Sequence, residues 1–142
     1  MKRIVAGTAL ACTCAVVFQV FQLSLTGSFS MAADAPAKPM VVHNVFFSLT
    51  DGTPEKRQAL VAACKKYLAD HPGTVYFSAG VLSESLNRPV NDRDFDVGLH
   101  IVFKTMADHN AYQDHPRHQK FIDENKANWK KVRVFDSEVT SG

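Results

Sequence analysis

The chain has 142 residues and three cysteines, with 16 Lys and Arg against 14 Asp and Glu. This length provides for one domain with one core. Lys2 and Arg3 are the only charged residues before Asp34, so basic and acidic side chains balance at 14 each from there on, and the composition implies no basic face for nucleic acid.

Residues 1–33 have the pattern of a secretory signal peptide. A basic start is followed by an apolar middle and a small-residue end, and cleavage after Ala32 or Ala33 fits this pattern. We therefore expect export to the periplasm or the cell exterior, with no stable membrane insertion after cleavage. The alternative is an uncleaved N-terminal membrane anchor, because the uncharged run is long enough to span a bilayer. Residues 34–39 read as an Ala/Pro-rich linker before a domain at 40–139.

Cleavage of the leader would remove two of the three cysteines, Cys12 and Cys14. The remaining Cys64 has no partner for an internal disulfide. In an oxidising compartment the domain must then depend on packing for its stability.

The first half of the domain predicts a strand followed by a helix. Residues 40–49 are apolar, β-branched and aromatic, and they precede a turn, which is typical of a strand. Pro54 is suited to the first position of a helix, with Thr53 as its cap. One apolar stripe then recurs at three- and four-residue steps, formed by Leu60, Val61, Cys64, Tyr67 and Leu68.

The second half predicts a hairpin, a kinked helix and a last strand. Strands are expected at 74–83 and 94–104, joined by a polar loop, and a fourth at 130–139. Thr105 and Asp108 mark a helix start, and Pro116 should break that helix before it continues to about residue 128. The order β-α-β-β-α-β predicts an α+β, ferredoxin-like fold: an antiparallel four-stranded sheet with its helices on one face.

The two faces of this sheet differ in composition. The odd-numbered positions are strongly apolar and should lie under the helices: Val45, Phe47, Leu49, Val75, Phe77, Val97, Leu99, Ile101 and Phe103. The even-numbered face is half apolar, with Val42, Phe46, Tyr76, Leu82 and Val102 beside His100. Because such a face is a liability when uncovered, we expect a second copy to pack against it in a homodimer.

Four side chains around the kink and the first strand are candidates for chemistry. His43 shares the parity of the core face, so it is either an acid or base, or a core histidine bonded to backbone or Tyr112. Tyr112 and His118 flank Pro116 and should line a pocket, with His118 neutral near the helix start. His115 precedes Pro116 and is suited to capping a helix.

The sequence gives weaker evidence for a function of the other histidines and for metal binding. His71 and His109 are expected near the surface at helix ends. Three imidazoles can hold zinc or copper, but the spacing of His115 and His118 is weak for this, so neither a metal nor a cofactor is predicted.

Several separated residues carry a family resemblance: Val42, His43, Phe46, Gly73, Phe95, Asp96, Phe103, Tyr112, the run His115-Pro116-Arg117-His118, and Phe135-Asp136. The chain resembles stress-responsive A/B barrel (Dabb) domains. The resemblance implies a dimeric α/β barrel formed by two ferredoxin-like protomers. It also implies a ligand-binding set of His43, Val97, Tyr112, His115 and His118. A plant polyketide cyclase of the family has histidines and a tyrosine matching His43, Tyr112 and His118, but a further histidine where this chain has Val97.

The sequence leaves three functions open. The first is an exported binding or stress-type homodimer that holds a small hydrophobic or aromatic ligand. The second is a cyclase-like enzyme acting on a carbonyl or aromatic compound with His43, Tyr112 and His118 as catalytic residues, and the third is a cofactor-free monooxygenase of a related barrel family. The pattern alone does not decide between an enzyme and a binding protein.

Overall fold

A computed structural model describes residues 38–140, so the predicted signal peptide and residues 34–37 of the linker lie outside the described part. Within it the element order is β1 (Met40–Leu49), α1 (Pro54–Leu68), β2 (Thr74–Val81), β3 (Val97–Phe103), α2 (Met106–Gln113), α3 (Pro116–Asn125), a short 3-10 helix (Lys126–Asn128) and β4 (Trp129–Val139). None of these helices combines the length and the apolar character that crossing a membrane requires.

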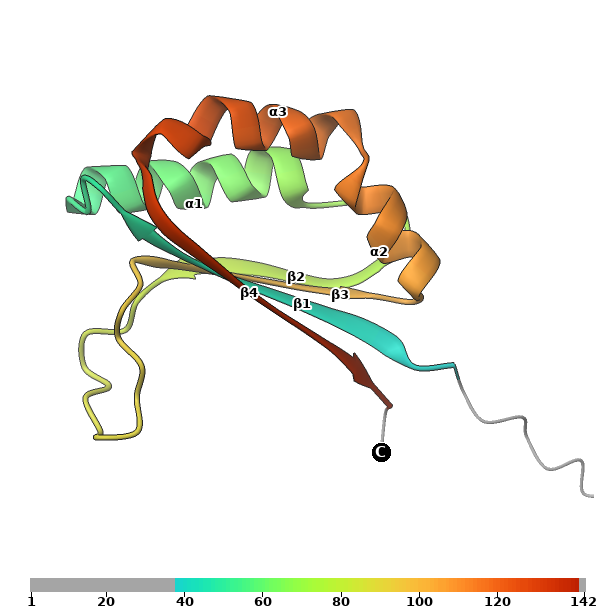
Figure 1. Ribbon diagram of the computed structural model, residues 1–142, viewed down its shortest axis with the longest axis horizontal. Helices are drawn as coiled ribbons and strands as arrows, with labels where there is room; N and C mark the ends of the chain where they lie inside the picture. Colours follow the sequence, from blue (N-terminus) through green and yellow to red (C-terminus); the bar gives the residue numbers. More distant parts are fainter. Residues whose placement is uncertain (1–37, 141–142) are drawn as a thin grey trace, which may run out of the picture. The chain divides into compact units, whose positions relative to one another are not determined.

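The four strands form one antiparallel sheet in the order β2-β3-β1-β4. The helices cover one face of it, with α1 and α3 lying side by side (Figure 1). Their apolar faces and the sheet enclose a core that includes Leu60, Leu68, Leu99, Ile101, Phe103 and Phe121. The predicted α+β, ferredoxin-like arrangement is therefore confirmed, although β2 ends two residues earlier and β3 begins three residues later than expected.

Cys64 belongs to this core. The thiol is fully buried in α1, and burial raises its pKa to about 12. Since the thiolate is the reactive form, this cysteine is a packing residue.

Capping residues explain where two of the helices begin. Thr105 accepts a hydrogen bond from the backbone N–H of Asp108 and starts α2, as predicted. His115 caps α3 by accepting from the N–H of Arg117, and Pro116 separates the two helices. Thr53 precedes α1, but its side chain makes no cap bond, so that part of the prediction is wrong.

The pairing of β1 with β4 brings residues of opposite parity onto one face. His43 lies opposite Ile101 of β3 and opposite Asp136 of β4. Directly opposed residues of an antiparallel pair share a face. The face under the helices therefore takes odd-numbered residues of β1 and β3 but even-numbered residues of β4.

Val75 departs from the predicted core pattern. Its side chain is 46 % exposed, and the pairing of β2 with β3 shifts register between Thr74 and Tyr76. The extra residue of a β-bulge is left unpaired and changes the parity of its strand. The expectation that Val75 packs under the helices is therefore wrong.

Gly73 has a positive φ of 79°, and a Cβ there would lie 2.2 Å from Cγ of Asp108. We expect Gly73→Ala to destabilise the fold by about 1 to 3 kcal/mol, because it strains the backbone and displaces a capping residue of α2. Urea unfolding measures the loss. Gly80→Ala is the matched control, since nothing lies within 4 Å of that added Cβ. Equal stability of the two variants would contradict the account.

Candidate functional site

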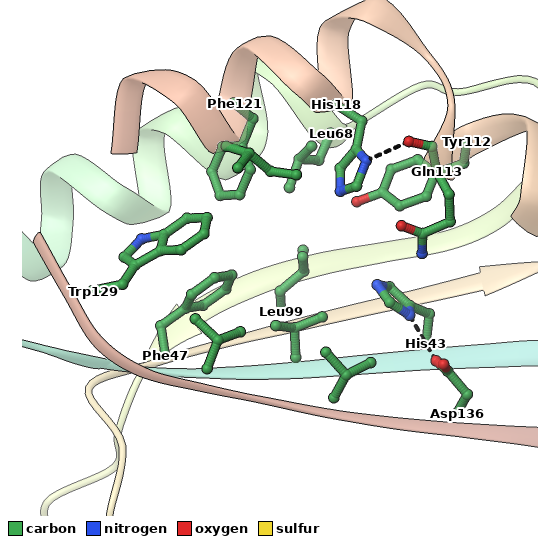
Figure 2. Close-up of a pocket in the computed structure, with 14 residues that line it drawn as sticks. His43, Phe47, Leu68, Leu99, Tyr112, Gln113, His118, Phe121, Trp129 and Asp136 are labelled. Atoms are coloured by element: carbon green, nitrogen blue, oxygen red, sulfur yellow. Dashed lines mark hydrogen bonds and ion pairs between the residues drawn. The ribbon is translucent and has the colours of Figure 1, made fainter. Parts of the chain in front are cut away.

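A cavity of about 340 Å³ lies between the sheet and the helices α2 and α3. Figure 2 shows its lining side chains. One end is apolar and aromatic, with Phe47, Leu68, Phe121 and Trp129. The other end is polar, with His43, Tyr112, Gln113, His118 and Asp136. The volume and the mixed lining are those of a small-molecule pocket.

At the polar end, Nδ1 of His43 lies 2.6 Å from Oδ1 of Asp136 (Figure 2). His43 is 4 % exposed, whereas the carboxylate side chain is half exposed. Burial lowers the pKa of His43, and the opposing effect of Asp136 is smaller. The imidazole is therefore neutral near pH 7. Its Nδ1–H donates to the carboxylate, which leaves Nε2 as an acceptor.

Asp136 was not among the residues predicted for the site. Of the two alternatives for His43, a core histidine bonded to backbone or to Tyr112 is wrong in its partner, because the imidazole bonds to Asp136. The Tyr112 ring instead makes an edge contact with His43, with ring centroids 5.8 Å apart. Knowing the register of β1 with β4 would have placed Asp136 beside His43.

His118 reaches the same cavity from α3. Its Nδ1 donates to the backbone carbonyl of Gln113 at 2.9 Å, so Nε2 is left without a proton. Burial lowers the pKa of His118, as expected for a neutral imidazole, and the Gln113 carbonyl opposes this more weakly. A second acceptor nitrogen thus faces the pocket beside Tyr112 (Figure 2).

Tyr112 lies on α2 with its ring stacked near His118, at a centroid distance of 4.5 Å. It is 2 % exposed, and its hydroxyl has no hydrogen-bond partner among the described residues. Burial raises the pKa of this phenol, so it stays protonated and remains a donor. Because a buried hydroxyl without a partner is costly, an acceptor atom of a ligand or a water fits at this position.

The other two residues of the implied ligand-binding set lie elsewhere. Val97 is fully buried in β3 opposite Phe47 and does not line the main cavity. His115 lines a separate cavity of about 70 Å³ with His71 and the back of Tyr112. The structure therefore brings His43, Tyr112 and His118 together and leaves Val97 and His115 outside their pocket.

His71 and His109 are not surface residues, contrary to expectation. His71 is 4 % exposed, and its Nε2 donates to the carbonyl of Tyr67 at 3.0 Å. The preceding Asp70 has a φ of 55°, a left-handed turn that accompanies the return of His71 to the C-terminal end of α1. His109 is half-buried, with its ring 5.2 Å from that of His43. Counting from the Thr105 cap would have placed it on the same helix face as Tyr112.

Fold and pocket together define a ferredoxin-like α+β domain with a ligand-sized cavity under its helices. The chain belongs to the stress responsive A/B barrel domain (Dabb) family, whose profile matches residues 41–139.

Solved structures share the fold. A Dabb family protein from Mesorhizobium loti is 23 % identical over 74 % of this chain and 100 % of its own, with a TM-score of 0.59. A dimeric ferredoxin-like protein of unknown function from Thermobifida fusca is 17 % identical over 74 % and 95 %, with a TM-score of 0.59. A hydroxynitrile lyase from Passiflora edulis is 19 % identical over 75 % and 98 %, with a TM-score of 0.60. No curated protein matches the chain.

Proposed function

We propose that this domain binds a small, largely apolar compound with a carbonyl or hydroxyl group in the main pocket, and that His43 exchanges a proton with it. The observation that carries the proposal is the 2.6 Å contact between His43 and Asp136 at the polar end of the cavity. A buried neutral imidazole held by a carboxylate is the usual arrangement of a general base.

The side chains that line the pocket suggest different roles in binding and proton transfer. Nε2 of His43 faces the cavity and accepts a proton from a carbon or hydroxyl next to the polar group of the ligand. Tyr112 keeps its proton and donates a hydrogen bond to the oxygen on which negative charge develops. Phe47, Phe121 and Trp129 supply an apolar surface that suits a ring or an alkyl chain.

A binding protein without catalysis is the second candidate. The observation in its favour is Val97, which stands where the resembling plant cyclase has a further histidine. In that case the same pocket holds the ligand and no proton transfer follows. The two candidates differ in what replacement of His43 does to chemistry rather than to binding.

A panel of aryl ketones, aldehydes and 2-hydroxynitriles tests ligand binding, the last class being suggested by the Passiflora neighbour. We expect at least one compound to raise the melting temperature. Tyr112→Phe and His43→Phe should weaken that shift while leaving folding nearly intact, because the first change nearly conserves volume and the second places a larger ring beside the cavity that His43 lines.

The matched control for Tyr112→Phe is Tyr67→Phe, which removes another buried phenol hydroxyl that is bonded to Glu124 outside the main pocket. It should leave the shift unchanged. If no compound stabilises the unmodified protein and both pocket variants fail to fold, the polar residues form a structural cluster and the proposal is wrong.

We also propose that the mature protein is exported. The support is the signal-peptide pattern of residues 1–33. Intact-mass measurement on protein from the producing cell should give a chain starting near Ala33 or Asp34. Full-length precursor retained in membranes would instead support an N-terminal anchor.

Finally, we propose that two copies pair through the sheet face that the helices leave bare. Phe46, Phe95 and Phe135 form an aromatic cluster there, beside a cavity of about 320 Å³. Phe135 and Tyr76 are both more than half exposed. Apolar surface of this kind is typical of an interface, and some structural neighbours are described as dimeric.

A further inference from the structure

His109, which has no role in the proposed proton transfer, completes a group of possible metal ligands with His43 and Asp136. One donor atom from each of the three lies within 4.8 Å of the others. They come from three elements, β1, α2 and β4. We propose that these residues bind a divalent ion of the later first transition series, with Zn²⁺ as the representative ion.

The donor types suit this class of ion. Two imidazoles and one carboxylate form a nitrogen-rich set that zinc, copper and nickel favour, whereas Mg²⁺ prefers oxygen ligands throughout. The imidazole donors also have lone pairs to offer. Nε2 of His109 lies 3.1 Å from Nε2 of Gln113, whose amide donates to it, so this nitrogen has a lone pair that can bind an ion in place of the Gln113 contact. Nδ1 of His43 can bind the ion once its proton has moved to Nε2.

The distances between the three donor atoms allow them to coordinate one ion after small side-chain movements. Two ligand atoms bound to one zinc ion lie about 3.3 Å apart, as follows from metal–ligand bonds near 2.0 Å. Nδ1 of His43 and Oδ1 of Asp136, at 2.6 Å, need to separate slightly, and His109 needs to approach. The half-exposed carboxylate has the freedom to do so, and solvent reaches the site on its side.

Metal binding at this site has a consequence for the proposed proton transfer. This consequence is the only part of the inference that rests on the proposed function. The ion takes the place of the single proton on Nδ1 of His43, and that proton moves to Nε2, so the imidazole stays neutral. An Nε2–H cannot accept a proton from a ligand, so zinc should inhibit turnover.

Calorimetric titration with ZnCl₂ tests the site in a tag-free chain, freed of metal by chelation, in which Cys12 and Cys14 are replaced by Ser. We expect one ion per protomer and a higher melting temperature with zinc, but neither effect with MgCl₂. His109→Gln and Asp136→Asn should each weaken zinc affinity roughly 10-fold or more, since each removes a ligand. His100→Gln is the control, because this half-buried histidine bonds Asn44 on the other sheet face.

Absence of stoichiometric zinc binding would overturn the inference, and so would binding that His109→Gln and Asp136→Asn leave unchanged. If His109→Gln fails to fold, Asp136→Asn alone decides, because its side chain is half exposed. Zinc binding without any carbonyl chemistry would refute the proposed function and keep the metal site. Carbonyl chemistry without zinc binding would refute the metal site and keep the proposed function.

Discussion

Asp136→Asn is expected to lower turnover of a carbonyl substrate by about 100-fold or more, with the fold retained. The carboxylate accepts from Nδ1 of His43 and so keeps Nε2 unprotonated. An asparagine amide can donate to Nδ1 instead, which favours the opposite tautomer and removes the base from the pocket. The loss should appear in kcat rather than in ligand affinity, because in the proposed mechanism Asp136 orients the imidazole and Tyr112 binds the ligand oxygen.

The matched control is Glu138→Gln. It makes the same chemical change two residues further along β4, at another exposed position on the same strand face. Steady-state kinetics and circular dichroism on both variants separate a catalytic loss from an unfolding effect. Equal activity of Asp136→Asn and the unmodified protein would mean that the carboxylate does not orient the base.

Val102→Asp is expected to convert the proposed homodimer to monomer and to destabilise the chain. Val102 lies opposite Val42 and Tyr76 in the middle of the sheet face that the helices leave bare. A carboxylate buried there without a partner costs several kcal/mol, which is large against a typical domain stability of about 5 to 15 kcal/mol.

Light scattering gives the oligomeric state, and urea unfolding gives the stability. Val90→Asp is the control, because that loop valine is 85 % exposed and its replacement should change neither quantity. If the unmodified protein is itself monomeric, the dimer proposal is wrong.

The fold follows from local signals that act over short stretches. The apolar stripe from Leu60 to Leu68, the Thr105 cap and the Pro116 break each depend on neighbours within one or two helical turns. The exact strand ends and the bulge at Val75 depend on pairing between strands, which the sequence does not reveal. The prediction therefore gave the element order but misplaced single residues of β2.

The candidate site likewise contains residues that local sequence predicts and residues that only the strand pairing places. Strand parity and the break at Pro116 predict that three side chains line one pocket: His43, Tyr112 and His118. Asp136 could not be predicted, because β4 presents its even-numbered residues to the pocket and only the register with β1 places it opposite His43. His71 was misjudged because its burial depends on the left-handed turn at Asp70, a backbone choice without a strong sequence signal.

Proton exchange at a bound ligand tests the central claim most directly. In D₂O, the carbon-bound hydrogens next to the carbonyl of a bound aryl ketone should exchange at a rate that NMR can follow. We predict exchange at least about 100-fold faster with the unmodified protein than with His43→Phe, because only the former has the imidazole that Asp136 orients toward the ligand. Equal exchange rates with the two proteins, for a ketone that binds both, would contradict the assignment of His43 as the base.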